Sequence, residues 1–415
     1  MHDQVADGEA VLVLNAGSSS IKFELFALEG GGAVSRLSGQ VEGLGAAPRV
    51  IARDGRGRLL VDRRWQQGEA GPTDHASALA IIIEGLDRAA PGARLLAVGH
   101  RVVHGGPDFA APVPVDAEML RRLETFVPLA PLHQPHNLAG IAAAAERFAG
   151  IPQIACFDTA FHRSHAWEAD TFALPPQFHA RGIRRYGFHG LSYEFIARSL
   201  AAEDPVLGQG RLVVAHLGNG ASLCAIRDGR SVDSTMGFTA LDGVPMGTRS
   251  GQIDPGVLLY LLDHDRMSSA EISRLLYGNS GLKGMSGLSQ DVRDLEASDR
   301  PEAARALSHF AWRVRREIGA LAAALGGIDA LVFTAGIGEN AAGVRRRICA
   351  GLEFLGIRLD PARNQANEAE LSPDGSAVRV LMRRTDEERM IALHVLALLG
   401  RAGQAAAGPD QIRSQ

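Results

Sequence analysis

Cysteine is scarce in this sequence, with three residues among 415. Cys156, Cys224 and Cys349 lie far apart, and no two of them have the spacing of a zinc ligand pair. This excludes a disulfide-stapled scaffold and a zinc ribbon, since both need several cysteines at short intervals. Free thiols fit a reducing compartment, and we therefore expect a cytoplasmic protein.

Charge of one sign and long apolar runs are also lacking. The 43 basic and 47 acidic residues leave a net charge of −4, and the basic run 345–347 is short, so nucleic acid is not an expected partner. The most apolar stretch, residues 319–333, contains Asp329 and is shorter than the ~18–20 residues of a spanning helix. Residues 1–10 are polar and acidic, unlike a secretory signal. We expect neither a membrane partner nor export.

Glycine, by contrast, is abundant, with 48 residues among 415, against an average share near ~7%. The length exceeds the ~250–300 residues at which single cores stop growing, which predicts two domains. The excess glycine gathers in four short segments, residues 15–20, 216–222, 243–251 and 336–340.

Two of these segments join strand-like runs in the same way. Residues 11–14 are apolar and residues 21–25 alternate, which predicts a β-hairpin around 15–19. Residues 212–215 and 222–226 repeat this plan in the second half. The repetition indicates a duplicated unit or chance, since such hairpins are common. Strand and helix patterns mix in both halves, so the predicted class is α/β.

The first hairpin loop carries groups suited to a phosphate. Residues 15–20 offer closely spaced backbone N–H groups and three hydroxyls, and Lys22 follows on the emerging strand. The glycine spacing is not that of a P-loop. An ordinary hairpin turn remains the alternative interpretation.

Residues 216–220 and 336–340 place glycines where a nucleotide could approach the backbone. The second segment follows the buried run 331–334 and precedes a helical pattern at 341–350, which would put a helix N-terminus beside a ligand. Turn chemistry alone is the alternative.

Arg101 and Arg249 each stand in a short glycine-containing segment after apolar residues. Guanidinium forks match carboxylate and phosphate oxygens, so we expect both to contact a ligand rather than solvent. Mg²⁺ prefers one or two carboxylates with phosphates and water, and Asp158 and Glu387 are the candidates. An acidic helix start is the alternative for Glu387.

Histidine pairs such as His100 and His104 or His162 and His165 raise the question of a zinc site. None has the His-Glu-x-x-His arrangement and no third ligand is evident, so zinc is not expected. From its surroundings alone, His189 is interpreted as a hydrogen-bonded core residue.

Taken together, six motifs closely resemble those of the acetokinase family of short-chain carboxylate kinases, in order and over nearly the whole chain. They are residues 14–23, 157–162, 186–190, 216–220, 246–256 and 336–340.

The resemblance implies two ribonuclease-H-like, actin-like and sugar-kinase-like domains with an active-site cleft between them. Residues 1–157 with 390–415 would form the first domain, which the C-terminal helix completes. Residues 158–389 would form a nucleotide-binding domain that also makes a homodimer. The implied reaction is reversible transfer of the ATP γ-phosphoryl group to acetate, which gives acetyl phosphate and ADP. Direct in-line transfer is favoured over a phosphorylated Asp158.

The resemblance also implies roles for individual residues. Asn15 and Glu387 would hold Mg²⁺, with Mn²⁺ as an alternative, and Lys22 would lie near the ATP phosphates. Arg101 would bind the acetate carboxylate. Asp158 would be the essential acid beside the reacting centre.

His189 and Arg249 would stabilise the transferring phosphoryl group. A larger set would surround ATP or ADP: His216, Leu217, Gly218, Asn219, Gly220, Asp291, Val292, Arg293, Gly336, Ile337, Gly338, Glu339 and Asn340.

Val103, Leu132 and Phe188 would line the acyl pocket, with Ala240 at a position that is proline in some family members. A smaller residue there enlarges the pocket, so a propionate or butyrate kinase is the alternative within the family. The non-enzymatic alternative is an actin-like ATPase module. Arg101, Arg249 and His189 count against it, because such a module needs no carboxylate site.

Overall fold

The computed structural model describes residues 8–401, apart from 31, 67, 68 and 91. The chain divides into two compact units, residues 1–161 with 386–415 and residues 162–385. The polar start at 1–7 and the end of the expected first domain, 402–415, lie outside the described residues. No helix within 8–401 is long and apolar enough to cross a membrane.

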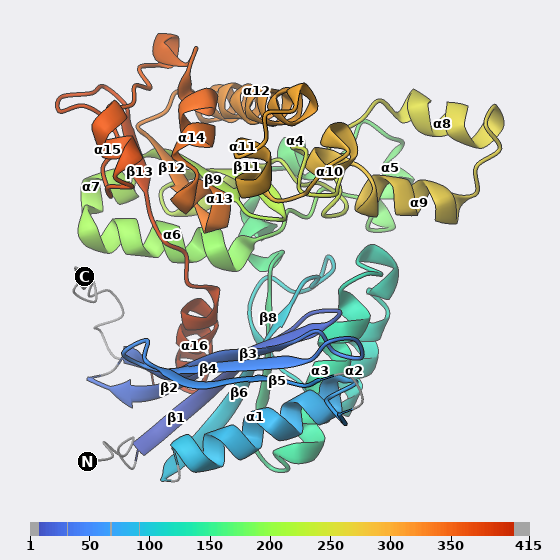
Figure 1. Ribbon diagram of the computed structural model, residues 1–415, viewed down its shortest axis with the longest axis vertical. Helices are drawn as coiled ribbons and strands as arrows, with labels where there is room; N and C mark the ends of the chain where they lie inside the picture. The colour runs from blue at the N-terminus through green and yellow to red at the C-terminus, as the bar shows by residue number, and fades with distance from the viewer. Residues whose placement is uncertain (1–7, 31, 67–68, 91, 402–415) are drawn as a thin grey trace. The chain divides into compact units, whose positions relative to one another are not determined.

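The first unit contains a mixed sheet, in the order β5-β4-β3-β2-β1-β6-β8-β7 over its described residues (Figure 1). Strand β1 pairs antiparallel with β2 and parallel with β6, which pairs parallel with β8. The strands are β1 (Gly8–Ala16), β2 (Ser20–Glu29), β3 (Gly32–Glu42), β4 (Arg49–Asp54), β5 (Leu59–Arg64), β6 (Ala93–Val102), β7 (Val113–Pro114) and β8 (Gln153–Phe157). The expected first hairpin is thereby confirmed.

Helices cover both faces of this sheet. They are α1 (His75–Ala89), α2 (Ala117–Glu124), α3 (Gln134–Arg147) and α16 (Glu387–Leu398), with a 3₁₀ turn at Val127–Leu129. Because strand residues alternate between faces, Asn15 points to α16 and its neighbour Ala16 lies against Gly140 of α3. A Cβ on Gly99 of β6 would come within 2.6 Å of Ile391. Glycine there lets α16 pack directly on the strand.

The second unit contains a sheet in the order β11-β10-β9-β12-β13 over its described residues. The strands are β9 (Arg211–Leu217), β10 (Ala221–Arg227), β11 (Arg230–Ser234), β12 (Ala330–Thr334) and β13 (Arg379–Met382). Helix α12 buries Phe310, Val314 and Ile318. Because these residues are four positions apart, they lie on one face of the helix, and this face packs on the sheet. Helix α6 lies on the other face (Figure 1).

The helices of this unit are α4 (Trp167–Asp170), α5 (Pro176–Ala180), α6 (Gly190–Glu203), α7 (Pro205–Gly208), α8 (Pro255–Asp263), α9 (Ser269–Gly278), α10 (Gly281–Ser286), α11 (Val292–Glu296), α12 (Pro301–Leu325), α13 (Ala335–Asn340), α14 (Ala342–Cys349) and α15 (Pro361–Gln365), with 3₁₀ turns at Ala160–Ser164 and Glu353–Leu355.

The two sheets share one plan. In each, three antiparallel strands are followed by two parallel ones: β3-β2-β1-β6-β8 matches β11-β10-β9-β12-β13. The α/β class and the repeated hairpin are confirmed. Ligands of open α/β sheets bind beyond the carboxyl ends of parallel strands, so the residues after β1, β6 and β8, and after β9 and β12, are the places to look for a site.

Candidate active site

The first unit brings three of the predicted residues together at the carboxyl edge of its sheet. Asn15 lies near the end of β1, Arg101 near the end of β6, and Asp158 directly after β8. Arg101 Nε lies 3.0 Å from Asp158 Oδ1 and Nη2 lies 2.7 Å from Oδ2, which makes a bidentate pair. Asp158 is fully buried, so this strong pair is shielded from water.

The N-terminus of α16 adds acidic groups to the same edge. Arg101 Nη1 lies 3.4 Å from Glu387 Oε2, and Asn15 Nδ2 donates to Glu388 Oε1 at 3.4 Å. Asp386 caps the helix by accepting from the Arg389 N–H at 2.8 Å. The acidic helix start, which was the alternative interpretation of Glu387, is therefore present. Glu387 also forms an ion pair with Arg101. The sequence analysis missed Glu388, the acid that contacts Asn15.

The carboxyl groups at this edge outnumber the two arginines beside them, Arg101 and Arg389. Burial, together with the nearby Asp386 and Glu388, raises the pKa of Glu24 on β2 to about 7. Burial and Glu388 raise the pKa of Asp386 to about 6. Burial lowers the pKa of Arg101, but Asp158 and Glu387 outweigh it, so the pKa lies above its usual range.

The loop at 15–20 is held from three sides. The Asn137 side chain donates to Ala16 O at 2.6 Å, His75 Nε2 donates to Gly17 O at 2.7 Å, and the Leu44 N–H donates to Ser19 O at 3.1 Å. The Gly17 N–H closes the turn onto Ser20 O at 2.8 Å. This is an ordered hairpin turn, and exposed Lys22 follows it on β2.

In the second unit, the predicted phosphoryl-binding residues His189 and Arg249 lie beside one glycine. A Cβ on Gly220 would lie 3.5 Å from His189 Nε2 and 3.8 Å from Arg249 Nη1. His189 adopts φ 57°, a left-handed conformation that is uncommon for a non-glycine residue. Its ring stacks on His216 with centroids 4.2 Å apart. Glycine at 220 thus keeps side-chain atoms away from the space beside these two nitrogen atoms.

The predicted nucleotide segment 216–220 contains the last two residues of β9 and the turn to β10. The other segment, 336–340, is not the loop we expected, because Ala335–Asn340 forms the short helix α13. Glu339 Oε1 accepts from the Ala335 N–H at 2.9 Å, and the Asn340 side chain donates to Gly336 O at 2.9 Å. These local bonds turn the glycine-rich run into a helix, and Glu339 itself takes the first N–H.

Arg345 is a residue whose importance the sequence did not reveal, since it opens the short basic run 345–347. It is fully buried and donates to the carbonyls of Gly338 and Glu339 at 2.8 and 3.0 Å. Its Nε donates to the Asn364 side chain at 2.8 Å. A buried cation therefore braces the C-terminal end of α13.

Asp291, Val292 and Arg293 stand at the start of α11. Asp291 accepts from the Arg293 N–H at 2.9 Å and pairs with its side chain at 2.6 Å. Hydrogen bonds from Arg293 lower the pKa of Asp291 to about 2. Val292 is buried and anchors the turn, whereas the Arg293 side chain is exposed.

The predicted acyl-pocket residues are divided between the units. Val103 of the first unit is buried, and its N–H donates to the Asn137 side chain at 3.0 Å, whereas Leu132 of the same unit is exposed. Phe188 of the second unit is buried. The carbonyl of Ala240 accepts from Arg249 Nη1 at 3.1 Å.

A buried hydrogen-bonded chain fixes the backbone at Phe188. His162 Nε2 donates to Phe188 O at 2.9 Å, so its Nδ1 accepts from the Ser231 hydroxyl at 2.8 Å in the neutral ring. His165 Nε2 contacts the same hydroxyl oxygen at 2.7 Å. Burial lowers the pKa of His162 to about 4 and that of His165 to about 2.

This pair predicts loss of stability in mild acid. The pKa of each folded ring lies below the ordinary histidine value of 6.5, so the unfolded chain binds protons first as pH falls, and the free energy of unfolding falls with it. Between pH 7 and pH 5 each ring should cost about 2 kcal/mol. Urea unfolding of wild type and His165→Asn at both pH values tests this. Equal pH slopes for the two proteins would contradict it.

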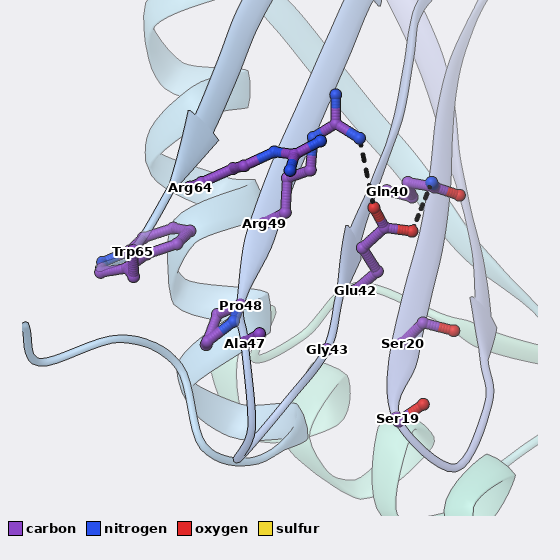
Figure 2. Close-up of a pocket in the computed structure, with 10 residues that line it drawn as sticks. All are labelled: Ser19, Ser20, Gln40, Glu42, Gly43, Ala47, Pro48, Arg49, Arg64 and Trp65. Atoms are coloured by element: carbon purple, nitrogen blue, oxygen red, sulfur yellow. Dashed lines mark hydrogen bonds and ion pairs between the residues drawn. The ribbon is translucent and has the colours of Figure 1, made fainter. Parts of the chain in front are cut away.

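A cavity of about 490 Å³ opens in the first unit beside the 15–20 loop (Figure 2). Ser19 and Ser20 of the loop form part of its wall, and Gln40, Glu42, Arg49 and Arg64 come from strands β3 to β5. Glu42 accepts from Gln40 at 3.0 Å, and Arg49 pairs with Asp62 at 2.8 Å. The predicted Arg101 and Asp158 do not line it.

Two α/β units share one plan, and each carries charged or hydrogen-bonding side chains at the carboxyl edge of its parallel strands, which defines a class of two-unit α/β proteins with ligand-type residues at these edges. The comparisons with known proteins identify the family. The model of the acetokinase family matches residues 10–393. The chain belongs to this family.

Its relatives are similar over almost their full length. An acetate kinase of Methylocella silvestris is 53% identical over 401 residues, which cover 95% of this chain and 99% of the relative. The crystal structure of Porphyromonas gingivalis acetate kinase has 36% identity and a TM-score of 0.82, over 94% of this chain and 100% of that one. A propionate kinase structure from Francisella tularensis has 34% identity and a TM-score of 0.85, over 93% and 98%. These likenesses confirm the expected fold class.

Proposed function

We propose that this protein is an acetate kinase, which transfers the γ-phosphoryl group of ATP reversibly to acetate and forms acetyl phosphate and ADP. The observation that carries the proposal is the convergence of His189 Nε2 and Arg249 Nη1 beside Gly220, in a chain that belongs to the acetokinase family. Phosphoryl transfer needs positioned N–H donors for the equatorial oxygens and little covalent chemistry from the protein.

Arg101 is the proposed ligand of the acetate carboxylate. Two of its nitrogens are held by Asp158, so Nη1 is the end directed away from that pair, toward Glu387 at 3.4 Å. Asp158 orients the guanidinium through this pair. Since both oxygens of Asp158 accept from Arg101, its carboxylate is poorly placed to act as a nucleophile, which supports direct transfer over a phosphorylated enzyme.

We propose that the second unit binds the nucleotide through His216–Gly220, Asp291–Arg293 and Gly336–Asn340. His189 and Arg249 would then donate to the transferring phosphoryl group, and Lys22 of the first unit would offset phosphate charge. Donors already fixed in place stabilise the charge that develops in the transition state without reorganising.

Mg²⁺ is the proposed metal, with Asn15 and Glu387 as its protein ligands and Mn²⁺ as an alternative. The carboxyl groups of Glu24, Asp386 and Glu388, which gather beside Asn15 and Glu387, fit this because a divalent cation would balance their negative charge. No three His, Cys, Asp or Glu residues of the described chain form a metal cluster of their own. When bound, Mg²⁺ would supply charge neutralisation at the phosphates, with water and phosphate as its other ligands.

Propionate is the second candidate acceptor, favoured by the small Ala240 and by the likeness to a propionate kinase structure. We expect acetate and propionate to differ in kcat/KM by about 10-fold, since one methylene is worth ~1–3 kcal/mol. Ala240→Pro should lower kcat/KM for propionate more than for acetate. Trapping the acyl phosphate with hydroxylamine for acetate, propionate and butyrate measures this. An unchanged ratio in the variant would remove Ala240 from the pocket.

We also propose a cytoplasmic homodimer. Helix α8 has no buried residue, although Val257, Leu259, Tyr260 and Leu262 are apolar or aromatic. Monomers rarely leave such a patch uncovered, and aromatic and aliphatic residues are typical of interface cores. Cys156, Cys224 and Cys349 are buried and form no disulfide, which fits a reducing compartment.

A charged residue on the exposed apolar face of α8 should dissociate the proposed dimer. Leu259→Glu should shift the sedimentation coefficient from that of a dimer to that of a monomer, because a carboxylate would be buried without a partner. Val206→Glu is the matched control, since Val206 is an exposed apolar residue of α7. A dimer that persists in Leu259→Glu would place the interface elsewhere.

A further inference from the structure

Two imidazole rings lie stacked in the second unit, each with a buried serine at the same ring atom. The rings of His189 and His216 have centroids 4.2 Å apart and planes inclined by 17°. His189 Nδ1 lies 2.8 Å from Ser222 Oγ, and His216 Nδ1 lies 2.8 Å from Ser192 Oγ. Both serines are fully buried, so neither hydroxyl can turn to water.

The hydrogen bonds around Ser192 fix the proton of His216. Thr385 Oγ1 donates to Ser192 Oγ at 2.8 Å. The serine proton is then directed to His216 Nδ1, which must accept it. A neutral ring that accepts at Nδ1 carries its own proton at Nε2.

The hydrogen bonds at Ser222 have the same donor-to-acceptor direction as those at Ser192. The Tyr193 hydroxyl lies 2.6 Å from Ser222 Oγ. A phenol is the better donor and an aliphatic hydroxyl the better acceptor, because the phenolic proton is the more acidic. Tyr193 therefore donates to Ser222, which donates to His189 Nδ1 and leaves the proton of this ring at Nε2 as well.

Both Nε2 atoms lie near the turn between β9 and β10. A Cβ on Gly220 would lie 3.5 Å from His189 Nε2, and a Cβ on Gly218 would lie 3.9 Å from His216 Nε2. Arg249 Nη1 lies 3.8 Å from the Gly220 position. Glycine at both positions thus keeps side-chain atoms away from these three nitrogen atoms.

We propose that Ser222 and Ser192, supported by Tyr193 and Thr385, are positioning residues that hold the two stacked imidazoles as paired Nε2–H donors to the oxygens of the phosphoryl group in transfer. The inference rests on the proposed function and adds to it the tautomer of each ring. In the opposite tautomer a ring would present a lone pair to the anion, which repels it. Two fixed donors from stacked rings match two oxygens of a phosphoryl group.

Nitrogen NMR of the protein labelled with ¹⁵N-histidine tests the tautomers directly. We expect both rings to show a protonated Nε2 and an unprotonated, hydrogen-bonded Nδ1, with signals assigned by their loss in His189→Asn and His216→Asn. A proton at Nδ1 in either ring overturns the inference for that ring. This measurement needs no turnover.

Ser222→Ala and Ser192→Ala supply the kinetic test. Each should lower kcat by about 10- to 100-fold, as loss of an orienting partner does, while KM for acetate changes little. Ser222→Thr should recover most of kcat, because it keeps the hydroxyl. The matched control is Ser372→Ala, which removes another buried, hydrogen-bonded serine of this unit and should leave kcat unchanged.

The positioning role of the serines and the proposed acetate kinase function would be overturned by different results. Wild-type kcat in both serine variants, with unaltered histidine spectra, would overturn the positioning role while acetate kinase activity stands. A wild-type protein that forms no acyl phosphate would instead overturn the proposed function, and with it the role toward a phosphoryl group. The spectra would still decide the tautomers.

Discussion

Replacement of Arg249 by alanine should lower kcat about 10³-fold, since an arginine aimed at a transferring phosphoryl group is worth about 10³–10⁵ in rate. Its Nη1 lies beside the Gly220 position together with His189 Nε2. The guanidinium would meet charge that is largest in the transition state, so KM for ATP and acetate should change far less than kcat. Steady-state kinetics of acyl phosphate formation measure both.

Arg249 also donates to Ala240 O, so a structural loss must be separated from a catalytic one. Added guanidinium ion should partly restore kcat in Arg249→Ala, because it supplies the missing donors without repairing the backbone contact. Arg249→Lys keeps the charge but not the fork and should recover only part of the rate. A near-normal kcat in Arg249→Ala would refute the role given to this residue.

Replacement of Asp158 by asparagine should impair both acetate binding and folding. The amide can accept through one oxygen only and turns an N–H₂ toward Arg101, so the bidentate pair is lost. We expect kcat/KM for acetate to fall about 100-fold, mainly through KM. Breaking a buried ion pair should also lower the free energy of unfolding by about 3 kcal/mol.

The chain offers a matched control for this pair. Arg211 and Asp329 form a similar fork, with Nη2 to Oδ1 at 2.6 Å and Nε to Oδ2 at 3.1 Å, but both side chains are partly exposed. Asp329→Asn should cost less than about 1 kcal/mol and leave the kinetics unchanged. Equal effects of the two variants would mean that burial of the Asp158 pair has no special role.

The parts of the fold that could be predicted are those with local patterns. Residues 11–14 form an apolar run and residues 21–25 alternate, as strands do, and the structure places them in the β1–β2 hairpin. The buried run 331–334 lies in β12 (Ala330–Thr334). The order of the strands within each sheet could not be predicted from local patterns, because packing decides which distant segments pair.

Some residues of the site could likewise be predicted from the sequence, and others could not. Arg101 and Asp158 could be selected by chemistry, the first as a guanidinium in a glycine-containing segment and the second as a candidate carboxylate for Mg²⁺, whereas the role of Asn15 came from the family resemblance. Glu388 and Arg345 could not. Glu388 looks like one acid in a helix start until α16 packs beside β1, and Arg345 looks like a surface charge until its bonds to Gly338 and Glu339 are seen.

The segment 336–340 was expected to be a loop, and this was wrong. Two glycines in five residues favour a turn, but the Glu339 carboxylate and the Asn340 amide each bond to backbone within the segment. Side chains that satisfy the backbone groups of a helix end can outweigh the helix propensity of glycine, which costs about 1 kcal/mol per residue.

The central claim is that a carboxylate oxygen attacks the γ-phosphorus of ATP. Incubation of the protein with ATP, Mg²⁺ and acetate labelled with ¹⁸O at both oxygens, followed by ³¹P NMR, tests this most directly. We expect acetyl phosphate whose phosphorus signal carries the isotope shift of an ¹⁸O bridge between carbon and phosphorus. No acetyl phosphate, or acetyl phosphate without ¹⁸O at the bridge, would contradict it.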